Sequence, residues 1–131
     1  MCHPPQEFYK KMAVGSAKDS ANKRLGRAGE KQALRYLQQN GYKILESNYK
    51  NPFGEVDVIA AKDDVIAFIE VKTRLNENYG APSEAVDRRR RQKYIQAAKY
   101  YFYGKQMDKT VRFDIIEILH GEINHIENAF Y

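Results

Sequence analysis

Two carboxylates and a lysine stand at spacings that would place them on one patch of a β-sheet. They are Asp57, which ends the stretch GEVD, and the pair Glu70 and Lys72, which flank Val71. Because strand side chains alternate between faces, Glu70 and Lys72 point the same way, about 6–7 Å apart. If the two stretches pair as a hairpin through residues 62–64, Asp57 lies across from them. Such a patch can hold a divalent metal ion against a phosphate.

The chemistry that these residue types suit is phosphodiester hydrolysis. A divalent metal supplies an activated water and neutralises charge on the transferring phosphate. Mg²⁺ needs only one or two carboxylates, because it retains several waters. We therefore expect Asp57 and Glu70 to bind Mg²⁺ or Mn²⁺, with Lys72 holding the attacking water or stabilising the phosphate charge. The alternative is a surface ion pair at a solvated strand end, in which Lys72 neutralises either acid.

A third acid, Glu30, lies near the start of an expected helix, in the segment Gly26-Arg27-Ala28-Gly29-Glu30. The glycines would let this helix approach the sheet or the substrate closely. Glu30 could then ligate the metal directly or through water. The alternative is a solvated acid that is stabilised by its position near the N-terminus of the helix.

Basic residues around this patch favour a polyanionic partner. The formal net charge is +5, which is mildly typical of nucleic-acid-binding proteins. A run of four arginines at 88–91 opens an expected helix, and Arg binds phosphates well. Consecutive residues point around the whole helix, so a solvated charged surface is the alternative. The residues expected to contact nucleic acid are Arg27, Arg74, Arg88, Arg91 and Gln96.

The elements that must position these residues follow from the apolar pattern. Three- and four-residue spacing predicts helices at 23–40 and 84–103, ended by Gly41 and Gly104. Apolar runs and alternation predict five strands, at 42–49, 55–61, 65–73, 111–119 and 122–127. The resulting order predicts an α/β fold, in which a mixed central sheet of about five strands is flanked by helices.

Two of these strands carry the candidate site. Strand 65–73 is apolar on both faces until its end, which is typical of a central strand. Residues 51–54 (NPFG) are expected to form a turn before the second strand. Strict alternation along that strand predicts one face with Glu55, Asp57 and Ile59 and the other with Val56, Val58 and Ala60.

Composition limits the class of protein. The 131 residues, 43% hydrophobic and 30% charged, suit one soluble domain with a single core. Residues 1–22 lack periodicity and are expected to be a flexible leader before a domain at 23–131. No apolar run approaches the roughly 20 residues that span a bilayer, and no secretory signal is recognisable, so we expect a cytoplasmic protein without a membrane partner. A single cysteine excludes an internal disulfide. His120 and His125 lack metal-ligand spacing and are expected to be structural.

Several ordered segments resemble the YraN family of bacterial endonuclease-like proteins, within the PD-(D/E)xK nucleases. The matching segments lie at 26–30, 54–60, 68–74, 80–86, 112–116 and 128–130. The resemblance therefore extends over about Leu25 to Phe130. It implies a restriction-endonuclease-like fold, close to that of archaeal Holliday-junction resolvases.

The resemblance also implies an active site and a function. In that group, the acid of the second strand, the acid and lysine of the third and often a glutamate of the first helix form the site. The corresponding residues here are Asp57, Glu70, Lys72 and Glu30. Val56 stands where the group's name has a proline. The implied activity is metal-dependent cleavage of DNA, including branched or junction DNA, with RNA as another substrate. Resolvases act as dimers, so a homodimer is expected.

Two other functions remain open. The first is a nucleic-acid-binding protein that keeps its acids as a relic of a nuclease, in which the arginines at 88–91 matter more than Asp57. The second is an adaptor that binds a protein through the tyrosine-rich part of the second helix. Salt-sensitive DNA binding would disfavour the adaptor.

Overall fold

The structure of the chain is a computed structural model that describes residues 17–74, 88–105 and 108–129. Two helices and five strands follow one another in the predicted order within these ranges. They are α2 (Ala17–Gln39), β1 (Lys43–Asn51), β2 (Gly54–Lys62), β3 (Val65–Arg74), α3 (Arg88–Phe102), β4 (Thr110–Leu119) and β5 (Glu122–Ile126). Residues 1–16 of the leader expected at 1–22, and the loop and helix start expected at 75–87, lie outside the described residues.

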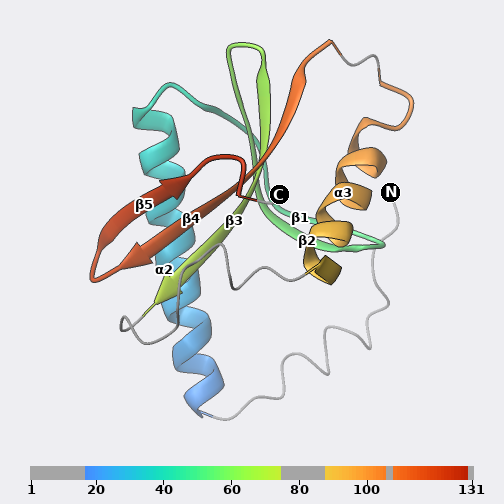
Figure 1. Cartoon of the computed structure of the whole chain (residues 1–131). Helices are drawn as coiled ribbons and strands as arrows, with labels where there is room; N and C mark the ends of the chain where they lie inside the picture. The colour runs from blue at the N-terminus through green and yellow to red at the C-terminus, as the bar shows by residue number, and fades with distance from the viewer. Residues whose placement is uncertain (1–16, 75–87, 106–107, 130–131) are drawn as a thin grey trace.

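The strands form one mixed sheet in the order β1-β2-β3-β4-β5. Strands β3 and β4 are parallel, and the other neighbouring pairs are antiparallel. Parallel neighbours need a crossover connection, and α3 lies in the connection between β3 and β4 (Figure 1). The predicted mixed sheet is therefore confirmed.

The two helices cover opposite faces of the sheet (Figure 1). On one face, Leu37 of α2 packs with Ile69 and Ile116. On the other, Tyr94 of α3 packs with Ile59 and Phe68. The middle of β3 is buried on both sides, as predicted for a central strand. Burial of this apolar surface on two faces is the main stabilisation of such a three-layer arrangement.

Helix α2 begins at Ala17, earlier than the expected start near residue 23. Its C-terminus matches the prediction. Gly41 has a φ of +86°, and the amide of Tyr42 donates to the Leu37 carbonyl at 2.9 Å. This is the arrangement by which a glycine in the left-handed conformation ends a helix. Neither α2 nor α3 combines the length and apolarity needed to cross a bilayer.

The predicted alternation along β2 is wrong at Val56. Val56 packs in the same core as Ile59, beneath α3, whereas Val58 packs on the α2 side. The reason lies in the strand pairing, because the β2–β3 ladder ends at Val58 and Ile69. Beyond that point β2 is released from β3, and Val56 turns toward α3.

Candidate active site

Asp57 lies where β2 and β3 separate. The last paired residues are Val58 and Ile69, and the amide of Val71 then donates to Oδ2 of Asp57 at 2.8 Å. The carboxylate thus occupies the place of a strand carbonyl at the end of the ladder. The expected position of Asp57 opposite Glu70 is confirmed by this contact, because Val71 directly follows Glu70.

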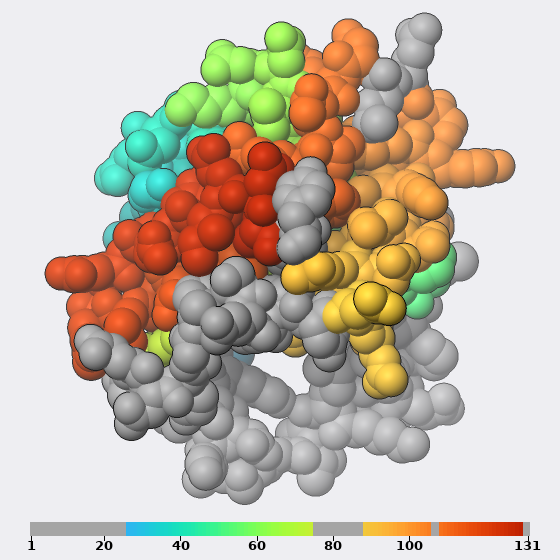
Figure 2. Space-filling model, viewed as in Figure 1, coloured from blue at the N-terminus to red at the C-terminus, as the bar shows by residue number. Residues whose placement is uncertain are grey.

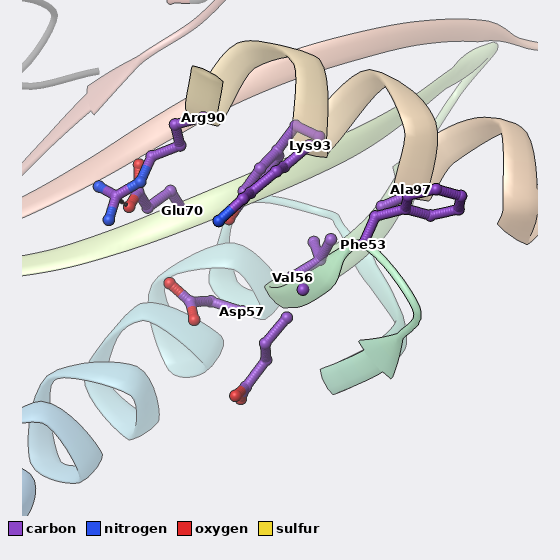
Figure 3. A pocket seen from close by; sticks show the side chains of 10 residues that line it. Phe53, Val56, Asp57, Glu70, Arg90, Lys93 and Ala97 are labelled. Carbon is purple, nitrogen blue, oxygen red and sulfur yellow. Dashed lines mark ion pairs between the residues drawn. The ribbon is translucent and has the colours of Figure 1, made fainter. Parts of the chain in front are cut away.

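Both acids line one pocket of about 250 Å³ between the sheet and α3. Its walls come from the β1–β2 turn, β2, β3 and α3. The lining residues are Phe53, Gly54, Glu55, Val56, Asp57, Glu70, Arg90, Lys93, Tyr94 and Ala97. Figure 3 shows Asp57 and Glu70 toward one end and Phe53 toward the other, with Arg90 and Lys93 projecting from α3. The pocket therefore joins acidic, basic and aromatic side chains.

The surroundings of Asp57 disfavour its charged form. Burial raises the pKa of Asp57 to about 7, and the hydrogen bond from the Val71 amide opposes this shift only in part. The carboxylates of Glu30, Glu70 and Glu55 raise it further. A nearby cation would reverse these effects, because it favours the ionised carboxylate.

Glu70 is already paired with a cation from α3. Oε1 of Glu70 lies 2.6 Å from Nη1 of Arg90 (Figure 3). The buried Oε2 has no hydrogen-bond partner among the described residues. Burial raises the pKa of Glu70, while Arg90 and Lys72 lower it. A buried acceptor without a donor is uncommon in folded proteins, so this oxygen is a candidate ligand for a cation.

Lys72 stands further along β3, on the side of Glu70 away from the β2–β3 turn. It is half-buried, and among the described residues it does not line the pocket. Burial lowers the pKa of Lys72, Glu70 raises it, and Arg90 and Arg74 lower it. The Lys72 amine and the Glu70 carboxylate therefore interact electrostatically. This agrees with the prediction that both side chains lie on the same face of β3.

Glu30 approaches this region from α2. With the Asn48 amide oriented so that its nitrogen faces the acids, it donates to Glu30 Oε2 at 3.1 Å and to Glu55 Oε1 at 2.9 Å. Burial raises the pKa of Glu30, and Glu55 raises it further. Asn48 thus holds two like charges together beside Asp57.

A glycine brings α2 close to the sheet at this point. A Cβ atom at Gly29 would lie 2.0 Å from Oγ1 of Thr73 in β3, whereas one at Gly26 would meet nothing within 4 Å. The close approach expected from the two glycines is therefore confirmed at Gly29. Since Glu30 directly follows, the same contact sets how near Glu30 comes to the strands.

The donors present fit a hard divalent cation only in part. The described residues contain no group of three or more His, Cys, Asp or Glu side chains that could share an ion, so Glu30 does not complete a ligand set with Asp57 and Glu70. Those two acids still offer oxygen ligands, one of them the unpartnered Oε2 of Glu70. Two carboxylates suit Mg²⁺, which keeps several waters.

The residues predicted to contact nucleic acid are dispersed. Arg27 and Arg88 are exposed, and Arg91 and Gln96 are half-buried. The side chain of Arg74 is 9% exposed, and its Nε lies 3.0 Å from Oε1 of Glu117. Arg74 would have to leave Glu117 to reach a phosphate. The start of α3, coloured yellow, stands at the surface in Figure 2.

Three pocket residues, Arg90, Tyr94 and Phe53, were missed by the sequence reasoning. Arg90 is the member of the arginine run that enters the pocket, because it lies one turn before the buried Tyr94 and two before Ala97. That helical stripe was the available signal. Tyr94 hydrogen-bonds the Asp57 backbone, and burial raises its pKa well above the usual value. Phe53 lay unnoticed in the predicted turn.

The chain resembles proteins of one family over most of its length. Residues 29–118 match the family model for Uncharacterised protein family UPF0102. A UPF0102 protein of Thermodesulfovibrio yellowstonii is 47% identical over 107 residues, which cover 82% of this chain and 96% of the relative. Another, from Clostridioides difficile, is 47% identical over 112 residues, which cover 83% and 98%. The chain therefore belongs to the UPF0102 family, which is the YraN family that its motifs indicated.

Proposed function

We propose that this protein is a metal-dependent endonuclease that hydrolyses phosphodiester bonds in DNA. The observation that carries the proposal is the convergence of Asp57 and Glu70 on one pocket, at the point where β2 leaves β3. The mixed sheet with a helix layer on each face is compatible with a restriction-endonuclease-like fold. Cleavage of branched or junction DNA by a homodimer belongs to the same proposal.

Asp57 and Glu70 would hold the metal, Mg²⁺ or Mn²⁺. When bound, the metal activates water and neutralises charge on the phosphate. Lys72 holds or orients the attacking water beside Glu70, and burial lowers the pKa of its amine. Glu30, held by Asn48, keeps a further negative charge near Asp57 and so strengthens attraction for a cation.

Arg90 has two alternative partners in this mechanism. In the structure it neutralises Glu70. A metal ion on Glu70 would take over that neutralising role, and the Arg90 side chain, 44% exposed, would then turn toward a phosphate oxygen. Arginine suits this exchange, because its guanidinium binds carboxylates and phosphates with similar geometry.

A non-catalytic DNA-binding protein is the second candidate function. It is favoured by the exposed arginines at the start of α3 and by the incomplete ligand set. In that case the acids would have no catalytic role, and DNA affinity would depend on Arg88 and its neighbours.

The two candidates are separated by cleavage assays on labelled single strands, duplexes, flaps and four-way junctions with Mn²⁺. We expect wild type to cut, and Asp57→Ala and Lys72→Ala to lose at least about 100-fold in rate while retaining most DNA binding. Asp64→Ala, at the exposed β2–β3 turn, is the matched acid control and should cut normally. Binding without cutting by wild type would favour the second function.

A further inference from the structure

Phe53 is an exposed aromatic residue at the candidate site. Among the described residues, the large hydrophobic side chains that are exposed are Phe53, at 40%, and Tyr103, at 88%. Exposure alone carries no functional meaning. Only Phe53 lines the pocket that contains Asp57 and Glu70, so its position distinguishes it from Tyr103.

The turn that carries Phe53 fixes its backbone. Its amide donates to Oδ1 of Asn51 at 2.9 Å, which is the bond of an Asx-turn. Pro52, between these two residues, restricts the backbone further. Tyr100 of α3 meets the ring edge to face, with ring centroids 6.3 Å apart. A ring that is already held in place loses little entropy when a ligand stacks on it.

The pocket arranges three kinds of chemistry along its length. Asp57 and Glu70 lie toward one end, Phe53 toward the other, and Lys93 projects between them (Figure 3). A nucleotide chain presents matching groups, because its phosphates alternate with planar bases. Lysine can neutralise a phosphate, and an aromatic ring can stack on a base of any sequence.

From this arrangement we infer that Phe53 is a stacking platform for an unpaired base, and that the site acts on nucleic acid with unpaired nucleotides beside the bond that is cut. The inference rests on the proposed function for the position of that bond, while the stacking itself can be measured without cutting. A base inside a duplex has both faces covered by its neighbours. A ring in a pocket therefore receives only a base that has left the stack.

The test measures binding with EDTA present, so that no cleavage occurs. The probes are a fluorescently labelled single-stranded oligonucleotide and the same sequence as a blunt duplex. We expect Phe53→Ala to weaken single-strand binding about tenfold and to leave duplex binding within about twofold. Phe53→Trp should bind the single strand like wild type, Phe53→Leu should resemble Phe53→Ala, and Tyr103→Ala is the matched control without effect.

A 2-aminopurine placed at successive positions of the single strand locates the stacked base, because stacking on Phe53 quenches its fluorescence. Quenching at one position that is lost in Phe53→Ala supports the inference. Equal losses for single strand and duplex, an equal effect of Tyr103→Ala, or no binding of single strands by wild type would each overturn it. If Phe53→Ala binds single strands like wild type while Asp57→Ala abolishes cutting, the nuclease function is supported and the stacking role of Phe53 is rejected. If Phe53→Ala weakens single-strand binding but wild type does not cut, the stacking role is supported and the nuclease function is rejected.

Discussion

Two aspartates on different strands of the same sheet, the half-buried Asp57 and the fully buried Asp114, have opposite surroundings. Asp114 of β4 is fully buried and accepts hydrogen bonds on both oxygens. Arg112 Nε donates to Oδ1 at 2.9 Å, His125 Nε2 lies 2.8 Å from Oδ2, and the Asn128 amide donates to Oδ1 at 3.2 Å. Asp57 of β2 accepts one amide bond and has acids for neighbours.

The difference shows in the ionisation of the two side chains. Burial alone would raise the pKa of Asp114, but hydrogen bonds from His125 and Arg112 hold it below its usual value. Burial raises the pKa of Asp57 to about 7. The charge on Asp114 is compensated by the fold, as expected for a structural group, and the role expected for His125 agrees with this. The charge on Asp57 is compensated only in part, by the Val71 amide, and such a perturbed pKa is typical of a functional site.

The comparison predicts its largest effect on stability at Asp114. Asp114→Asn removes the charge that holds Arg112 and His125, and leaves a buried guanidinium with reduced compensation. We expect a loss of about 3–5 kcal/mol in the free energy of unfolding, measured by urea denaturation at pH 7. Because the pKa of Asp114 is lowered in the fold, its contribution is present above the unfolded pKa near 3.8 and is lost as pH falls through the folded value.

The opposite sign is expected at Asp57. Its pKa rises from 3.8 to about 7 in the fold, so the stabilisation by its proton is full below pH 3.8 and lost as pH rises through 7. Asp57→Asn should therefore be more stable than wild type at pH 8, and the difference should shrink toward pH 4. The upper bound is about 4 kcal/mol, which partial exposure reduces. Urea denaturation in EDTA at several pH values measures it.

An Asp57→Asn variant that lost as much stability at pH 8 as Asp114→Asn would contradict the comparison. Asp57 would then be a structural group whose charge the fold compensates. Added Mn²⁺ should raise the stability of wild type at pH 8 more than at pH 6, because the carboxylate must be ionised to bind.

The surroundings of Asp57 could be predicted from the sequence better than those of Asp114. The order of elements, the mixed sheet and the meeting of Asp57 with Glu70 followed from apolar periodicity and hairpin spacing. Such patterns are local, and the hairpin joins its two strands through a short turn. The Asp114 network was not predicted, since Arg112 and His125 come together with Tyr42 only through tertiary packing.

The sequence reasoning singled out the two acids that line the pocket, Asp57 and Glu70, but not its arginine. Arg90 could not be separated from Arg88 and Arg91 without the helix phase, which depends on the burial of Tyr94. The turn of Val56 toward α3 was missed because the prediction assumed strict alternation past Val58, the last residue of β2 that pairs with β3. Both errors arose where packing between elements decides the direction of a side chain.

Helix α2 contacts the regions of both aspartates. Substitutions where it packs on the sheet are expected to change stability by a smaller amount. Tyr36 Oη lies 3.1 Å from His125 Nδ1, and Gly29 meets Thr73 near the acids. Gly29→Ala places a Cβ 2.0 Å from Thr73 Oγ1, so we expect a loss of about 1–3 kcal/mol. Gly26→Ala meets nothing within 4 Å and should gain about 0.5–1 kcal/mol. Thermal unfolding compares the stability of the two variants. If Gly29→Ala and Gly26→Ala changed stability equally, α2 could move away from β3 without loss of stability.

The smallest effect concerns Arg90, which partly compensates Glu70 as Arg112 compensates Asp114. The two arginines differ in exposure, since the side chain of Arg90 is 44% exposed and that of Arg112 15%. A metal that bound Glu70 would therefore displace a more exposed guanidinium than that of Arg112. Arg90→Gln should bind Mn²⁺ about three- to fivefold more tightly than wild type at pH 8, measured by calorimetry in the absence of DNA. Arg89→Gln, an exposed neighbour, is the control.

A weaker affinity for Mn²⁺ in Arg90→Gln would instead mean that the guanidinium holds Glu70 in position for the metal. The cleavage rate gives an independent reading of the same side chain. If Arg90 turns to a phosphate oxygen once the metal takes Glu70, the variant should bind metal more tightly and yet cut more slowly. Tighter metal binding together with unchanged cutting would mean that Arg90 acts only when no metal is bound, by neutralising Glu70. Arg90 would then compensate a buried acid as Arg112 does, with the difference that a metal ion can take its place.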